Sequence, residues 1–217
     1  MKTILDFLDD LRNNNTKEWM DKNKTRFQEA RREFESLVSI LIDRITLFDD
    51  SIAGIQPKNC IFRLNRDIRF SNDKRPYKEN MGAFISGEGK KGVDGGYYIH
   101  LEPGQSMLAG GSYMPPADVL GKIRQEIDYD PEPLLSFMRG KSFRQYFGDF
   151  AGDRLKTAPK GYAADHPNVG LLNLKSLIVT HPLSDKQVTG DNFIGYATEV
   201  FASIKPLNDF LKTAIRE

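Results

Sequence analysis

Six cationic side chains lie within sixteen consecutive residues, and their types and spacing are suited to holding an anion. The segment 63–78 carries six positive and two negative side chains, a formal charge of +4, whereas the whole chain of 217 residues carries +1. Arginine presents a planar fork of donors that fits phosphate and carboxylate groups. Arginines at intervals of three residues, Arg63, Arg66 and Arg69, therefore indicate an anion site or a network of salt bridges.

A second basic stretch, LKTAPKGYAADHP, surrounds a proline-glycine loop. If the two stretches approach each other in the fold, their cations would surround a pocket with a tyrosine as a stacking wall. The alternative is a solvated charged loop. The ligand expected is a small molecule that contains phosphate or carboxylate. The predicted ligand-binding residues are Arg63, Arg69, Lys74, Tyr77, Lys78, Lys156 and Lys160.

Two residues, Asp67 and His100, are candidates for catalytic proton transfer. In the stretch GGYYIHLEPG, the alternation of a strand places Tyr98, His100 and Glu102 on one face. Imidazole titrates near neutral pH and a neighbouring carboxylate can orient it, as a general base requires. The alternative is a structural histidine that is hydrogen-bonded within a sheet.

Other kinds of site lack their sequence signals. The histidines, His100, His166 and His181, are too far apart along the chain for the short spacing of zinc sites. The chain has no G-x-S-x-G motif, and its glycines fit turns better than a dinucleotide-binding fingerprint, which requires a strand, a loop and a helix in order. A single cysteine, Cys60, cannot form an internal disulfide. We expect neither a metal nor another cofactor, and the sequence does not decide whether the protein is an enzyme.

The composition is that of a globular protein, with 39% hydrophobic and 28% charged residues. The apolar runs are short for a bilayer, and the start MKTILDFLDD has acids where a signal peptide needs apolar residues. We therefore expect a cytoplasmic protein without a membrane partner. The net charge of +1 does not favour nucleic acid as a partner. The sequence does not predict an oligomeric state.

The segment that carries the arginines shows the period of a strand. Residues 59–70 alternate between apolar and polar side chains, which predicts a half-buried strand. On this interpretation the core face holds Phe62, Leu64, Ile68 and Phe70, and the polar face holds Arg63, Asn65, Asp67 and Arg69. Arg66 would intrude among the apolar side chains. Because an unpaired buried ion is costly, we expect Arg66 to pair with a distant acid such as Glu102 or Asp153.

The rest of the chain predicts helices at both ends and strands between them. Apolar spacing predicts a helix from Thr3 and a second helical region from Thr16 to about Phe48. Further strands are expected at 81–86, 97–102, 107–114 and 176–180, and further helices at 117–127, 133–138, 142–147 and from about 191. The prediction is a single α+β domain, residues 1–217, with a mainly antiparallel sheet of about five strands packed by N-terminal and C-terminal helices.

Five runs of sequence carry a resemblance to a known family. They are NNTKEWMDKNKTRF, FRLNRDIRFSNDKRPYK, GGYYIHLEPGQSMLAGGSYMP, LKTAPKGYAADHP and LLNLKSL. Together and in this order they resemble the motifs of the domain of unknown function 2461 family, over nearly the whole chain. The resemblance implies a single-domain α+β protein and assigns no biochemical activity.

Two functions from different classes follow from these observations. The first is a protein that binds or acts on a phosphorylated or other anionic small ligand through the basic segment. The second is a non-enzymatic interaction module that contacts a protein or a nucleic-acid backbone through the same basic face. A concave site with convergent arginines would favour the first function, and a flat or convex basic face would favour the second.

Overall fold

The computed structural model describes residues 1–216 and has the α+β architecture expected from the sequence. Its sheet is antiparallel and has the strand order β1-β2-β3-β4. The strands are β1 (Met81–Ile85), β2 (Tyr97–Leu101), β3 (Met107–Ser112) and β4 (Leu177–Pro182), close to their predicted positions. Strand β3 ends two residues earlier than expected, and Met114 beyond it has a φ of 44°, outside the range of a strand.

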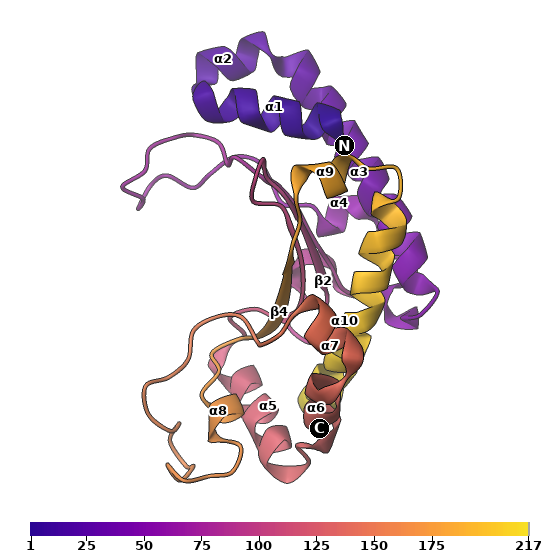
Figure 1. Ribbon diagram of the computed structural model, residues 1–217. Helices are drawn as coiled ribbons and strands as arrows, with labels where there is room; N and C mark the ends of the chain where they lie inside the picture. The colour runs from indigo at the N-terminus through magenta and orange to yellow at the C-terminus, as the bar shows by residue number, and fades with distance from the viewer. Residues whose placement is uncertain (217) are drawn as a thin grey trace. The chain divides into compact units, whose positions relative to one another are not determined.

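Helices precede the sheet, follow it and separate its last two strands (Figure 1). The helices are α1 (Lys2–Asn13), α2 (Lys17–Lys22), α3 (Lys24–Thr46), α4 (Pro57–Cys60), α5 (Ala117–Tyr129), α6 (Glu132–Arg139), α7 (Lys141–Tyr146), α8 (Val169–Leu172), α9 (Asp185–Thr189) and α10 (Phe193–Arg216), with 3-10 turns η1 (Asp50–Ile52) and η2 (Gly89–Lys91). Across residues 1–216, none of these helices combines the length and the apolar content that crossing a membrane requires.

The chain forms two compact units. The first contains Met1–Lys90, Tyr98–Leu108 and Pro182–Glu199, and the second contains Lys91–Tyr97, Ala109–His181 and the chain from Val200 onward. In the second unit the ring of Tyr97 packs edge-on against Phe201 of α10, with 5.5 Å between ring centroids. There, a Cβ on Gly110 of β3 would lie 2.6 Å from Ile204 Cγ2, so the absence of a side chain lets α10 pack closely on this strand.

The N-terminal helices of the first unit form where the apolar spacing predicts them. The apolar residues of α1 are buried, and Phe7 among them contacts the rings of Trp19 and Phe27 at 5.9 and 5.8 Å. The Thr16 hydroxyl caps α2 by accepting a hydrogen bond from the Trp19 N–H. Asn23 then separates α2 from α3, so the second predicted helical region is two helices.

The predicted strand at 59–70 is wrong. The helix α4 extends to Cys60, and two isolated bridges, Ile61 to Ala83 and Asn65 to Tyr77, are the β-pairing found in this segment. The prediction that both phenylalanines face the core is also wrong, because Phe62 is 37% exposed and Phe70 is 94% exposed. The sheet accordingly has four strands.

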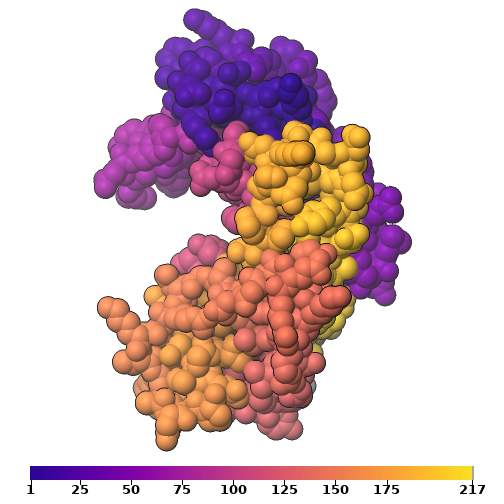
Figure 2. Space-filling model, in the orientation of Figure 1, coloured from indigo at the N-terminus to yellow at the C-terminus, as the bar shows by residue number. Residues whose placement is uncertain are grey.

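Local hydrogen bonds explain why this segment forms a loop. Asp67 Oδ1 accepts from the Arg69 N–H at 3.3 Å, Ser71 Oγ from the Asp73 N–H at 3.2 Å, and Asp73 Oδ1 from the Arg75 N–H at 3.0 Å. Such side-chain bonds satisfy backbone groups that a sheet would otherwise pair. The chain between α4 and β1 therefore extends from the first unit as a loop, visible as a projecting purple lobe (Figures 1 and 2).

Candidate functional site

The basic segment folds back on itself between α4 and β1. The Arg66 N–H donates to the Pro76 carbonyl at 2.9 Å, and the Lys78 N–H donates to the Leu64 carbonyl at 2.8 Å. On the other side of this short ribbon, Asn15 bonds to the backbone of Tyr77: its Nδ2 donates to the carbonyl, and its Oδ1 accepts from the N–H, both at 3.1 Å. These bonds fix the two halves of the segment at their base.

Three arginines of the segment are paired with carboxylates. Arg69 Nη2 lies 2.6 Å from Asp67 Oδ2, and Asp73 Oδ2 accepts from both Arg66 Nη1 at 2.5 Å and Arg75 Nη2 at 2.6 Å. Hydrogen bonds from Arg69 lower the pKa of Asp67, and those from Arg75 and then Arg66 lower the pKa of Asp73. These three arginines therefore belong to local ion pairs.

The expected distant partner of Arg66 was wrong, because its acid is seven residues away along the chain. Glu102 pairs instead with Arg12, and Asp153 lies 3.9 Å from Lys175. Arg66 is only half-buried, so a nearby acid at the loop surface is sufficient.

Arg63 and Lys78 differ from those arginines because neither has a carboxylate partner within residues 1–216. Lys78 Nζ lies 5.6 Å from the centroid of the Phe62 ring, a cation–π contact. Partial burial lowers the pKa of Lys78, and the positive charge of Arg63 lowers it further. Lys74 of the same segment donates to the Ile68 carbonyl at 3.1 Å.

His100 lies on β2 and is connected to this pair of cations through the rings of Tyr98 and Phe62. The strand buries Tyr97, Ile99 and Leu101 and leaves Tyr98 and His100 partly open, as the alternation predicts. His100 Nε2 lies 2.9 Å from Glu102 Oε2, so this pair is on the face where the sequence places it. The Tyr98 ring in turn lies edge-on to Phe62, with 6.3 Å between centroids, and this contact connects β2 to the ring beneath Lys78.

The hydrogen bonds around His100 assign its tautomer. A carboxylate accepts and cannot donate, so Nε2 carries the proton that is shared with Glu102. Nδ1 then has a lone pair, which faces the hydroxyl of Tyr98 at 3.0 Å and the Nδ2 amide nitrogen of Asn80 at 3.3 Å. In its neutral form the imidazole is therefore held by an acceptor on one side and two donors on the other.

Arg12 and Gln105 hold the carboxylate of Glu102 in place. Glu102 Oε1 accepts from Arg12 Nη2 and from Gln105 Nε2, each at 3.3 Å. Arg12 also lies 3.6 Å from Glu79, whose other oxygen pairs with Arg75 of the basic segment. A continuous polar network therefore connects the ion pairs of the loop with the imidazole of His100.

Sequence comparison assigns the chain to a family. The profile of a family of conserved hypothetical proteins, DUF2461, matches residues 3–210. The chain belongs to the DUF2461 family. No curated protein and no solved structure matches it. The family match agrees with the resemblance carried by the five sequence runs.

In this DUF2461 member, several residues of the site were not among those predicted. Tyr98 and Glu102 could have been included from the strand alternation, since they share a face with His100. Gly82 allows the phenol its position, because a Cβ there would lie 2.7 Å from the Tyr98 hydroxyl oxygen. Asn80 and Arg12 come from other elements, and no local sequence pattern indicates them.

Lys156 and Lys160, from the second basic stretch of this DUF2461 chain, are exposed residues of the second compact unit. Their contribution to a shared pocket stays a prediction. Tyr77 is half-buried in the basic segment, and burial, followed by the charges of Asp21 and Glu18, raises its pKa. Asp67 and Arg69 are exposed and paired with each other.

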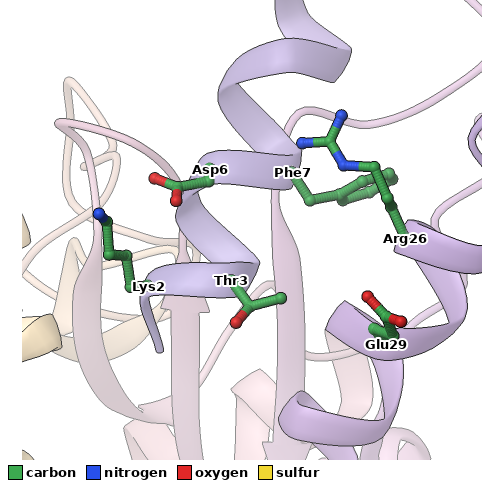
Figure 3. Close-up of a pocket in the computed structure, with 6 residues that line it drawn as sticks. All are labelled: Lys2, Thr3, Asp6, Phe7, Arg26 and Glu29. Atoms are coloured by element: carbon green, nitrogen blue, oxygen red, sulfur yellow. The ribbon is translucent and has the colours of Figure 1, made fainter.

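A hollow of about 230 Å³ lies between α1 and α3 (Figure 3), lined by Lys2, Thr3, Asp6, Phe7, Arg26 and Glu29. None of the predicted site residues lines it. Its charged side chains are of both signs, and Arg26 is paired with Asp10 at 2.6 Å. Within residues 1–216, no group of three or more histidine, cysteine or acidic side chains could hold a metal ion.

Proposed function

We propose that this DUF2461 member binds an anionic small ligand, phosphorylated or carboxylate-bearing, at Arg63 and Lys78. The observation that supports the proposal is the contrast within one segment. Arg66, Arg69 and Arg75 are paired with acids, whereas the two proposed ligand-binding cations have no such partner within residues 1–216. A ligand anion would provide the missing counter-charge.

The electrostatics of Lys78 favour an anion at this position. Its ammonium group is partly removed from water, and the charge of Arg63 repels it, so the pKa of the lysine is lowered. A bound anion would offset both effects, and it would raise the pKa of Lys78. The ring of Phe62 beneath the ammonium adds an aromatic surface on which a planar ligand could stack.

If the ligand undergoes proton transfer, His100 is better suited as the proton acceptor than Asp67. The Nδ1 lone pair of His100 faces the hydroxyl of Tyr98, which can exchange a proton, and Glu102 can stabilise the imidazolium that forms. Asp67 is exposed and paired with Arg69, and its pKa is lowered, which makes it a weak base. Arg69, Lys74, Tyr77, Lys156 and Lys160 stay sequence-based predictions of ligand contacts, outside the pair of cations on which this proposal rests.

The test is a thermal-shift screen against sulfate, phosphate, nucleotides and organic acids. A ligand that binds the folded state raises the melting temperature in proportion to its concentration relative to Kd. The double variant Arg63→Ala with Lys78→Ala should lose this shift. The matched control, Lys17→Ala with Lys24→Ala, removes two exposed cations of the same unit and should keep it. Equal shifts in the wild type and in the first double variant would refute the proposal.

The exposed aromatic ring of Phe70 supports a second candidate function, an interaction module. Phe70 is 94% exposed in the projecting loop, and the Arg69 guanidinium carbon lies 5.8 Å from its ring centroid. An exposed ring beside a cation could contact a partner protein or stack on a base beside a nucleic-acid backbone. Fluorescence anisotropy with a single-stranded oligonucleotide tests the nucleic-acid form: Phe70→Ala should weaken binding, whereas Leu47→Ala, at another exposed apolar residue, should not.

A further inference from the structure

When the imidazole of His100 is neutral, its Nδ1 accepts hydrogen bonds from two donors that could otherwise bind an anion. The hydroxyl of Tyr98 and the amide of Asn80 both face Nδ1, at 3.0 and 3.3 Å. While Nδ1 has a lone pair, both groups donate to it. Neither donor then points its proton toward a ligand.

A proton on Nδ1 would reverse this arrangement. An imidazolium donates from both nitrogens, so Nδ1–H would donate to the oxygen of Tyr98, and the phenolic hydrogen would have to rotate away. The amide of Asn80 would lose its acceptor at the same time. Both groups would then have a free N–H or O–H. We propose that protonation of His100 strengthens anion binding at Arg63 and Lys78 by releasing the donors of Tyr98 and Asn80 to the ligand.

The released donors lie next to the cations of the site. The ring of Tyr98 contacts Phe62, whose ring lies below Lys78 Nζ, and Asn80 is two residues beyond Lys78 along the chain. Burial and the charge of Glu102 raise the pKa of Tyr98 to about 12. The phenol therefore remains protonated over the pH range in which imidazole titrates.

Other charged groups near His100 come from three parts of the first unit. Glu102 follows the last residue of β2, Glu79 precedes β1, and Arg12 extends from α1 to both acids. Because Arg12 holds Glu102 in place, the imidazolium would have a positioned counter-ion. Protonation therefore changes the direction of the hydrogen bonds without leaving an unpaired charge.

This inference rests on the proposed anion site and narrows its ligand class. Two cations and two neutral donors suit an oxyanion with several acceptor oxygens, such as sulfate, phosphate or a phosphate monoester, better than a single carboxylate. Sulfate is the cleaner probe, because its charge stays constant over the pH range of the experiment.

The experiment is calorimetric titration of the full chain with sulfate from about pH 8 to about pH 5.5, the range in which imidazole gains a proton. We expect the affinity of the wild type to rise at least on the order of tenfold as the pH falls, the lower end of the gain for one hydrogen bond to a charged group. Buffers of different ionisation enthalpy should report proton uptake on binding. The pH dependence should disappear in His100→Gln and weaken in Tyr98→Phe.

The matched control is His166→Gln in the second unit, which removes a histidine that also contacts a carboxylate at 2.9 Å. It should keep the wild-type pH dependence. Nitrogen NMR of the wild type provides a measurement that needs no variant: sulfate should convert Nδ1 of His100 to its protonated form near neutral pH.

Two negative results have different meanings. If sulfate does not bind at any pH, the proposed anion site fails, and this inference fails with it. If sulfate binds with an affinity that does not depend on pH, or with equal pH dependence in His100→Gln, the inference alone fails and the anion site stands.

Discussion

Two histidines of this chain each donate to a carboxylate at 2.9 Å, His100 to Glu102 in one compact unit and His166 to Asp128 in the other. Each also lies beside a tyrosine, with 6.0 Å between ring centroids. They differ at Nδ1. In His166 this nitrogen accepts from the backbone N–H of Asn168 at 3.0 Å, whereas in His100 it faces two side-chain donors.

This difference determines what protonation would cost. A backbone N–H in a folded turn cannot rotate, so a proton on Nδ1 of His166 would face another donor. A phenol hydroxyl can rotate about its C–O bond and accept instead of donating. The same residue pair is therefore a fixed structural element at one site and an adjustable one at the other. A histidine–carboxylate contact does not distinguish these roles by itself.

The largest change in stability is expected when the carboxylate beside each histidine is removed. Glu102→Ala should lower the free energy of unfolding by about 2–3 kcal/mol, because it removes the acceptor of His100 Nε2 and one acceptor of Arg12 in a partly buried site. Asp128→Ala should cost less than about 1 kcal/mol, since that side chain is 51% exposed, compared with 18% for Glu102. Urea unfolding of both variants measures the difference, and equal losses would contradict the comparison.

The two tyrosines beside these histidines, Tyr98 and Tyr162, should contribute differently to the loss of stability at alkaline pH. Tyr98 is an acid whose folded pKa of about 12 exceeds its ordinary value of 10.0. The stability that this shift provides is therefore complete below the ordinary value and is lost as the pH rises through the folded one; two pKa units correspond to about 3 kcal/mol at most. Tyr98→Phe should remove this part of the alkaline loss in unfolding experiments. Tyr162→Phe should remove less, although burial raises the pKa of Tyr162 too. An unchanged alkaline profile in Tyr98→Phe would refute the prediction.

A glycine next to the adjustable site provides a third test. In Gly82→Ala the new methyl group would lie 2.7 Å from the Tyr98 hydroxyl oxygen, so the phenol must move away from His100. We expect a loss of about 1–2 kcal/mol in unfolding free energy, together with a changed Nδ1 signal of His100 in nitrogen NMR. Gly170→Ala is the control in the second unit, where no atom lies within 4 Å of the new carbon. If both variants leave the His100 signal unchanged, the contact does not position the phenol.

The smallest change in stability is expected when the exposed ion pair of the basic segment is broken. Arg69→Met should leave the unfolding midpoint unchanged, because Arg69 and Asp67 are both exposed to water. Arg66→Met removes a half-buried arginine and should lower the midpoint measurably without abolishing the anion response. A midpoint that falls more in Arg69→Met than in Arg66→Met would reverse this assignment.

The sequence predicts the elements that bury one continuous face. Strand β2 alternates as expected, and α1 buries its apolar stripe, because in both cases the period of the side chains matches the period of the backbone. The break at Asn23 was not predicted, since apolar spacing continues on both sides of it.

The basic segment was mispredicted because its period-two pattern competes with its turn chemistry. Asp67, Ser71 and Asp73 bond to nearby backbone N–H groups, and each such bond satisfies a donor that a strand would share with a neighbour. The same competition explains why the partner of Arg66 was mispredicted. Once the chain turns at the tip, Asp73 comes back beside this arginine, and a distant acid is not needed.

Only the part of the site that lies close together along the chain could be predicted from the sequence. Tyr98 and His100 lie on β2 and Glu102 follows its last residue, so local alternation places the three together. Asn80 and Arg12 reach the site through tertiary packing, which has no local period. The distinction between paired and unpaired cations in one segment depends on rotamers and on turn geometry, and composition alone does not reveal it.

The hydrogen bonds of Asn15 also have a consequence for assembly, because they occupy backbone groups at the edge of the ribbon. Its amide makes the two hydrogen bonds with Tyr77 that an added strand would make, so the outer edge of the ribbon is closed by a single side chain. Unpaired edge groups are templates on which other chains add in register and aggregate. Asn15→Ala would expose one donor and one acceptor beside an exposed phenylalanine loop, and we expect such a variant to form aggregates at concentrations where the wild type stays dispersed. On this expectation, one amide group protects the edge at Tyr77 as an added strand would.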